Sequence, residues 1–79
     1  MYDDNSSEHY IDANYNGGSM IVLEDGSMWE IDPVDQMISA SWLFNAVITV
    51  RSTNGGKYDY VLSNSDDGKD VHANFLGKR

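Results

Sequence analysis

The sequence predicts an all-β protein: a small five-stranded antiparallel barrel of SH3-like or OB-like size, with one helical turn between its second and third strands. Residues 18–31 contain two apolar runs on either side of Asp25-Gly26, which is the strongest short-range signal for a β-hairpin. Three more short alternating segments follow, separated by glycine-bearing turns. We expect the barrel to be closed, because a flat sheet of this size would expose two edges.

The first hairpin joins predicted strands at residues 19–24 and 27–31. A two-residue turn and a three-residue turn with a left-handed Gly26 give different registers. The first register gathers Met20, Val22, Trp29 and Ile31 on one face, and the second gathers Ile21, Leu23, Trp29 and Ile31. We expect the second, because it leaves both glutamates of the hairpin in water.

The helical turn is predicted at Asp32-Pro33-Val34-Asp35. Asp32 is suited to cap the helix, Pro33 to occupy its first position, and Asp35 to face the positive end of the helix dipole. A run rich in serine and β-branched residues begins at Ile38, so a single turn is expected.

The remaining strands are predicted at residues 46–51, 58–63 and 70–76, each with apolar and polar positions in alternation. Turns rich in Asn, Asp and Gly separate them at residues 53–56 and 64–68. The side chains expected on one face of each strand are Ala46, Ile48 and Val50, then Tyr58, Tyr60 and Leu62, then Val71, Ala73 and Phe75.

Residues 1–17 are predicted to form a disordered acidic tail, and residues 18–79 the barrel domain. The first sixteen residues are rich in Asp, Asn and Ser, contain four acids and no Lys or Arg, and show no sustained periodicity. The alternative is an extra edge strand through residues 9–11.

Composition excludes several function classes. Thirteen acidic residues against five basic ones give a net charge of −8, which disfavours binding to nucleic acid or to anionic membranes. The longest apolar run, residues 20–23, is too short for membrane insertion. No leader is visible, so we expect a periplasmic or secreted protein if a leader was removed and a cytoplasmic one otherwise.

Several of these residues together resemble a group of small bacterial proteins, many of them exported, whose function is unknown. In that group an LEDGS-x-W-E-V hairpin is followed by a helical turn, a tryptophan-containing segment and a Y-x-L-x-N-x-D-D-G hairpin. The matching residues here are 23–27, Trp29, Glu30, Ile31, Pro33, Asp35, Trp42, Tyr60, 62–64 and 66–68. The resemblance covers about residues 18–76 and implies the fold and a bacterial origin. It implies no catalytic residue, because the shared residues belong to turns and core.

No motif predicts catalysis, so we expect a protein that is not an enzyme and has no cofactor. The chain has no cysteine, and neither His9 nor His72 has a partner at metal-ligand spacing. Residues 64–70 carry alternate Asn and Asp side chains, but they lack the glycine and glutamate positions of a calcium-binding loop. We therefore interpret them as a turn and expect no metal site.

The candidate binding residues are the aromatic side chains Trp42, Tyr58 and Tyr60 and the apolar side chains Met20, Val22 and Met28. The aromatic residues fit a barrel core, with a binding groove as the alternative. The other three form an apolar face of the first hairpin that suits a partner or a second copy of the chain, and the alternative is a strongly coiled barrel that buries both faces of a bent strand. The sequence therefore predicts a protein-binding or structural module, monomeric or weakly dimeric, with an unidentified protein partner. The alternative is an acidic inhibitor that imitates DNA and occupies a basic groove.

Overall fold

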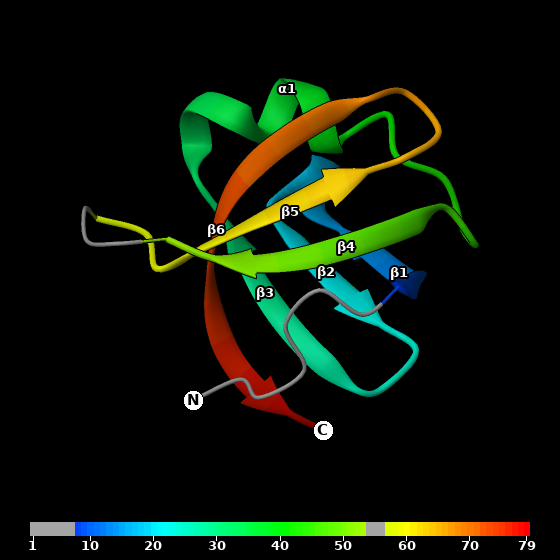
Figure 1. The fold of residues 1–79 in the computed structure, drawn as a ribbon, viewed down its shortest axis with the longest axis horizontal. Helices are drawn as coiled ribbons and strands as arrows, with labels where there is room; N and C mark the ends of the chain where they lie inside the picture. Colours follow the sequence, from blue (N-terminus) through cyan, green and yellow to red (C-terminus); the bar gives the residue numbers. More distant parts are fainter. Residues whose placement is uncertain (1–7, 54–56) are drawn as a thin grey trace.

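In the computed structural model, the described residues, 8–53 and 57–79, form a closed antiparallel barrel of six strands (Figure 1). The strand order around the barrel is β1-β2-β3-β6-β5-β4. The strands are β1 (Glu8–Tyr15), β2 (Met20–Leu23), β3 (Ser27–Ile31), β4 (Val47–Ser52), β5 (Tyr60–Asn64) and β6 (Lys69–Lys78). Two 3-10 turns, η1 (Asn16–Gly18) and η2 (Pro33–Asp35), and a short helix, α1 (Gln36–Ser39), complete the elements.

The prediction of a disordered tail is wrong for β1, and the barrel has six strands rather than five. β1 pairs with β2 on one side and with β4 on the other, so it closes the barrel. Its own composition is polar, but His9 and Ile11 alternate inward and are buried. β2 is the next strand, but the pairing with β4 joins residues far apart in the chain, such as Tyr10 and Val47, which local periodicity does not report. Residues 1–7 of the predicted tail lie outside the described residues.

The first hairpin adopts the second of the two registers. Ile21 lies opposite Trp29, Gly26 has a left-handed φ of 87°, and the Gly26 N–H donates to the carbonyl of Leu23 at 2.9 Å. The predicted inward set is buried, and Glu24 and Glu30 are exposed.

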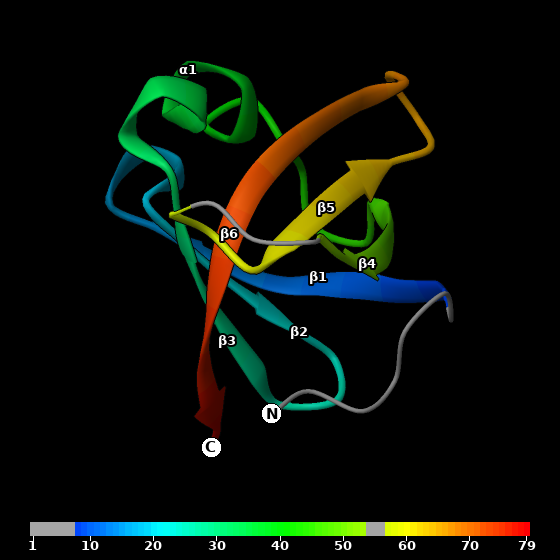
Figure 2. The ribbon, with the colours of Figure 1, turned by 60° about the vertical axis from the view of Figure 1, so that its left-hand side comes forward.

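The predicted helical turn is confirmed and is extended by α1. The Asp32 carboxylate accepts a hydrogen bond from the Val34 N–H at 3.1 Å, as a cap does. Figure 2 shows that this segment lies across one end of the barrel. The Ser39 hydroxyl donates to the Gly18 carbonyl at 2.7 Å and attaches α1 to η1.

The core is built around Trp29, which makes an edge-on contact with Tyr60 and a tilted contact with Phe75. The long strand β6 pairs with β5 along residues 69–73 and with β3 along residues 73–78. It runs from the end of the barrel near α1 to the opposite end, where the C-terminus lies (Figure 1). Strand bounds differ from the predicted ones by a few residues, and residues 54–56 of one predicted turn lie outside the described residues.

None of the helices in the described ranges has the length and the apolar character that a membrane crossing requires.

Candidate functional site

The three aromatic candidates are buried in the barrel. Trp42, Tyr58 and Tyr60 are 4%, 8% and 7% exposed. Trp42 donates its indole N–H to Asp67 Oδ2 at 3.0 Å, and Tyr60 packs its ring on Trp29 with the centroids 5.1 Å apart. Trp42 and Tyr60 therefore belong to the core cluster, as the core interpretation predicts.

The apolar face predicted from Met20, Val22 and Met28 is not an open surface. Val22 is fully buried, and both methionines are partly buried. In the strand pairing, Val22 lies opposite Ala13 of β1 on one side and opposite Met28 of β3 on the other. The sequence prediction placed residues 8–15 in a disordered tail, whereas β1 flanks the first hairpin on the side of β2.

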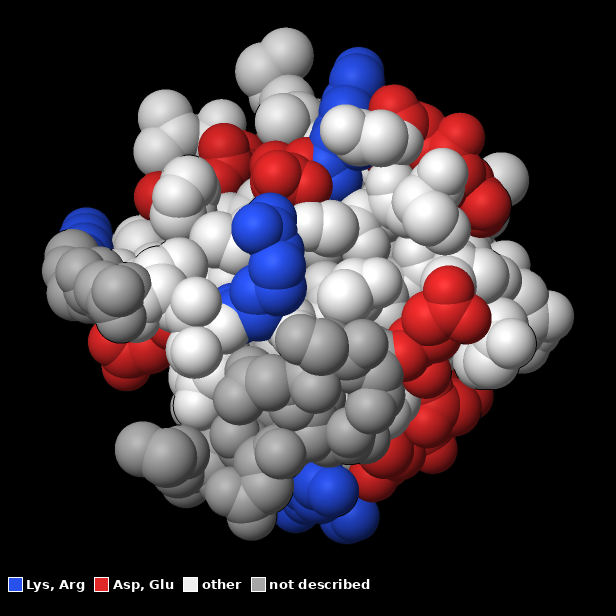
Figure 3. All heavy atoms as spheres, in the orientation of Figure 1, with Lys and Arg blue, Asp and Glu red and all other residues white. Residues whose placement is uncertain are grey.

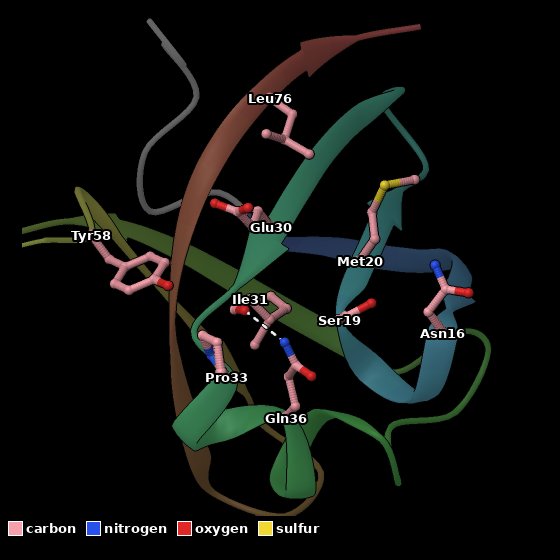
Figure 4. Close-up of a pocket in the computed structure, with 9 residues that line it drawn as sticks. All are labelled: Asn16, Ser19, Met20, Glu30, Ile31, Pro33, Gln36, Tyr58 and Leu76. Carbon is pink, nitrogen blue, oxygen red and sulfur yellow. Dashed lines mark hydrogen bonds between the residues drawn. The ribbon is translucent and has the colours of Figure 1, made fainter.

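Met20 and Tyr58 lie together at a different feature, an open groove of about 310 Å³ between β3, β6 and η2. Its lining residues are Asn16, Ser19, Met20, Glu30, Ile31, Pro33, Gln36, Tyr58 and Leu76 (Figure 4). The lining combines apolar side chains with a carboxylate, two amides and two hydroxyl groups. Such a mixture of apolar area and a few polar groups is typical of a ligand-binding surface.

Local backbone features give the groove its shape. β6 carries a bulge at Leu76, since Trp29 pairs with Phe75 and Met28 with Gly77. Leu76 follows the outward positions His72 and Asn74 in the alternation of β6, and its side chain is 51% exposed. On the other wall, Gln36 donates from Nε2 to the Ile31 carbonyl at 3.1 Å, which fixes α1 against β3.

The groove lies in a negative electrostatic environment. Burial of the ring raises the pKa of Tyr58, and the charges of Asp32, Glu30 and Asp35 raise it further. The neutral phenol is therefore favoured in the folded protein, and it keeps its hydroxyl proton as a donor at neutral pH. Within residues 8–53 and 57–79, no Lys or Arg forms an ion pair with any of these three carboxylates.

Each histidine lies beside two carboxylates, which sequence spacing did not predict. His9 Nδ1 lies 2.9 Å from Glu24 Oε1 and 3.9 Å from Asp25 Oδ2. His72 Nδ1 lies 3.1 Å from Asp35 Oδ2, and Asp32 completes this second group. His72 is thus a surface residue that has a carboxylate partner. No local spacing could have shown the contact, because 37 residues separate His72 from Asp35.

The polar residues of the β5–β6 turn stabilise the bend, as predicted. Asn64 Oδ1 accepts from the Asp66 N–H at 2.8 Å, and Gly68 has a left-handed φ of 71°. Asp67 accepts from the Lys69 N–H at 2.9 Å through Oδ1, and its other oxygen holds Trp42. The turn thus also connects β5 and β6 to the segment after α1.

The most exposed apolar side chains lie between β3 and β4: Val34, Met37, Leu43 and Phe44. Val34 and Met37 directly follow Pro33 and Gln36, which line the groove. The sequence prediction did not include these four residues. Val34 and Met37 are three positions apart within a helical turn, and this spacing indicates that they share one face.

No protein-family model, curated protein or solved structure matches this chain. The functional argument therefore depends on the geometry and charge of the molecule itself.

Proposed function

We propose that this protein is a non-enzymatic binding module whose groove holds an extended segment of a partner protein with apolar and basic side chains. The observation that carries the proposal is the groove of β3, β6 and η2, where Met20, Pro33 and Leu76 lie beside Glu30. Asp32 and Asp35 directly precede the lining residues Pro33 and Gln36 in the chain.

The apolar part of the proposed ligand is matched by Leu76, Met20 and Pro33. Leu76 is 51% exposed on the outward face of β6, and Met20 lies across the sheet from Glu30. In Figure 4 Leu76 and Met20 extend on different sides of Glu30. A ligand with an apolar side chain on either side of a basic one therefore suits this wall of the groove. The exposed Val34 and Met37 offer a continuation of the apolar surface beyond Pro33 and Gln36.

The basic part of the proposed ligand is matched by Glu30, Asp32 and Asp35. Carboxylates without a Lys or Arg partner in the described part of the chain attract a cationic side chain, and the net charge of −8 steers it toward the protein. Figure 3 shows several separate acidic groups on one face, with neutral and basic side chains between them. The DNA-imitation alternative calls for a regular row of acids, which the separate acidic groups on this face do not form.

The polar groups of the groove suit positioning rather than nucleophilic chemistry. Its one serine, Ser19, donates to the Tyr15 carbonyl at 3.5 Å, and no histidine is among the lining residues. A serine nucleophile needs an adjacent base. This supports a binding role for the groove.

Selection from a random phage-displayed peptide library tests the proposal, with a chelator present throughout. We expect enriched peptides to carry Lys or Arg beside apolar residues. In fluorescence polarisation, Leu76→Ser is expected to weaken their binding about tenfold, because burying one leucine side chain contributes about 1.5–3 kcal/mol and 1.4 kcal/mol is about tenfold.

Leu43→Ser is the matched control, since Leu43 is exposed but lies outside the groove. It is expected to leave the affinity unchanged. Enrichment of peptides without basic residues, or equal weakening by both leucine substitutions, would contradict the proposal.

A further inference from the structure

We infer that Asp32, Asp35 and His72 form a binding site for a divalent transition-metal ion of the Zn²⁺ type. The three residues come from the cap of η2, from the end of η2 and from β6. One donor atom of each lies within 4.8 Å of the donor atoms of the other two. The inference goes beyond the proposed function and depends on His72, which does not line the groove.

The distances fit coordination of one ion. Bonds of about 2.0–2.2 Å to nitrogen and oxygen place neighbouring ligand atoms about 2.8–3.6 Å apart in octahedral or tetrahedral geometry. His72 Nδ1 and Asp35 Oδ2 are 3.1 Å apart, which is in this range. An ion there binds the unprotonated Nδ1 and the Asp35 carboxylate in place of their direct contact, and the proton of the neutral ring is then on Nε2. Asp32 then needs only a small side-chain movement to supply the third ligand.

The backbone holds these ligands in place. The His72 N–H donates to Asp35 Oδ2 at 2.9 Å, and the Asp32 N–H donates to the His72 carbonyl at 2.9 Å. These two bonds join η2 to β6 on either side of the proposed site. The site is thus supported by rigid elements, and such support favours metal binding because less ordering is needed.

The ligand set selects the class of metal. Imidazole and carboxylate suit Zn²⁺ and its neighbours in the first transition series, whereas Ca²⁺ requires six to eight oxygen ligands. The His72 side chain is 58% exposed, so water can approach the site and fill the remaining coordination positions.

The second histidine group is a poor competitor. The His9 side chain is only 6% exposed, and Lys78 Nζ already lies 3.9 Å from Asp25 Oδ2. Glu24 Oε1 also accepts from the Tyr10 N–H at 2.8 Å. An ion entering there would meet a nearby positive charge and would have to displace hydrogen bonds that connect β1 to the first hairpin.

Isothermal titration calorimetry of the whole chain with ZnCl₂ tests the inference. We expect one Zn²⁺ per chain, at least about tenfold weaker binding in His72→Ala and in Asp32→Asn, and much weaker binding of CaCl₂. Asn at position 32 can still cap η2, so the second variant keeps the fold. Asp66→Asn removes one negative charge, as Asp32→Asn does, but at an exposed position away from the site. We expect it to alter the affinity for Zn²⁺ less than about twofold.

Nitrogen-15 NMR of the imidazole rings locates the ion. We expect Zn²⁺ to shift the His72 ring resonances and to leave those of His9 unchanged. Absence of binding at about 1 mM Zn²⁺, unchanged affinity in His72→Ala, or a shift confined to His9 would overturn the inference. The peptide selection is carried out in chelator, which removes metal ions. A failure to bind peptides and a failure to bind Zn²⁺ are therefore observed independently of each other.

Discussion

Replacing Trp29 by alanine is expected to lower the free energy of unfolding by about 3–5 kcal/mol, the usual loss for truncating a buried aromatic side chain to alanine. Trp29 is fully buried, and its ring contacts both Tyr60 and Phe75. Its indole N–H donates to the buried Ser27 hydroxyl at 2.8 Å, which in turn donates to Asp25 at 2.6 Å. The substitution therefore opens a cavity and also removes a donor from a buried polar chain.

Urea denaturation followed by circular dichroism measures this loss. Domains of this size have a total stability of about 4–12 kcal/mol, so the variant is expected to be partly unfolded or close to it at 37 °C. Trp29→Phe keeps most of the packing and is expected to lose less. Leu43→Ala, at a side chain that is 75% exposed, is the control and should change stability by less than about 0.5 kcal/mol. A loss below about 1 kcal/mol for Trp29→Ala would show that Trp29 does not organise the core.

Gly18→Ala is expected to destabilise the protein by about 2–5 kcal/mol. The φ of Gly18 is +91°, a conformation that costs an L-residue about 1–2 kcal/mol. A Cβ atom there would lie 2.4 Å from the Ala40 backbone nitrogen and 2.7 Å from Ser39 Oγ. Because the nearest atom belongs to the backbone, the segment after α1 must move away from η1, and overpacking of this kind costs about a further 1–3 kcal/mol.

The Gly17→Ala variant separates the cost of the positive φ from the cost of overpacking. Gly17 also has a positive φ, +66°, but a Cβ atom there meets nothing within 4 Å. Thermal or urea unfolding of both variants should show a larger loss for Gly18→Ala, by about 1–3 kcal/mol. Equal losses would mean that the contact between η1 and α1 adapts without cost.

The first hairpin could be predicted in detail because its information is local. Asp25 and Gly26 determine the turn, the turn determines the register, and the register determines which side chains are buried. The capped turn at Asp32 was predictable for the same reason, since the cap and its acceptor are two residues apart. The alternation in β4 and β6 likewise indicated the buried face of each strand, whereas β5 also buries Val61 on its other face.

β1 and the candidate sites could not be predicted in this way. β1 is polar and has no signal of its own, and its burial comes from pairing with β2 and β4. Alternation along β6 already indicated that Leu76 faces outward, but the groove also depends on the approach of Tyr58 to η2. The contact of His72 with Asp35 spans 37 residues. Each of these features is a long-range contact, and a single sequence contains no measure of which distant segments meet.

The sequence by itself determined the class of the fold, the register of the first hairpin, the helical turn and the acidic character of the surface. These follow from residue periodicity, turn chemistry and charge, which act over a few positions of the chain. Only the tertiary structure decided that six strands close the barrel, that Val22 and Trp42 are buried, and that Met20, Tyr58 and Leu76 line one groove. The reason is that barrel closure brings strand ends together from distant positions, and both proposed binding sites lie where those distant segments meet.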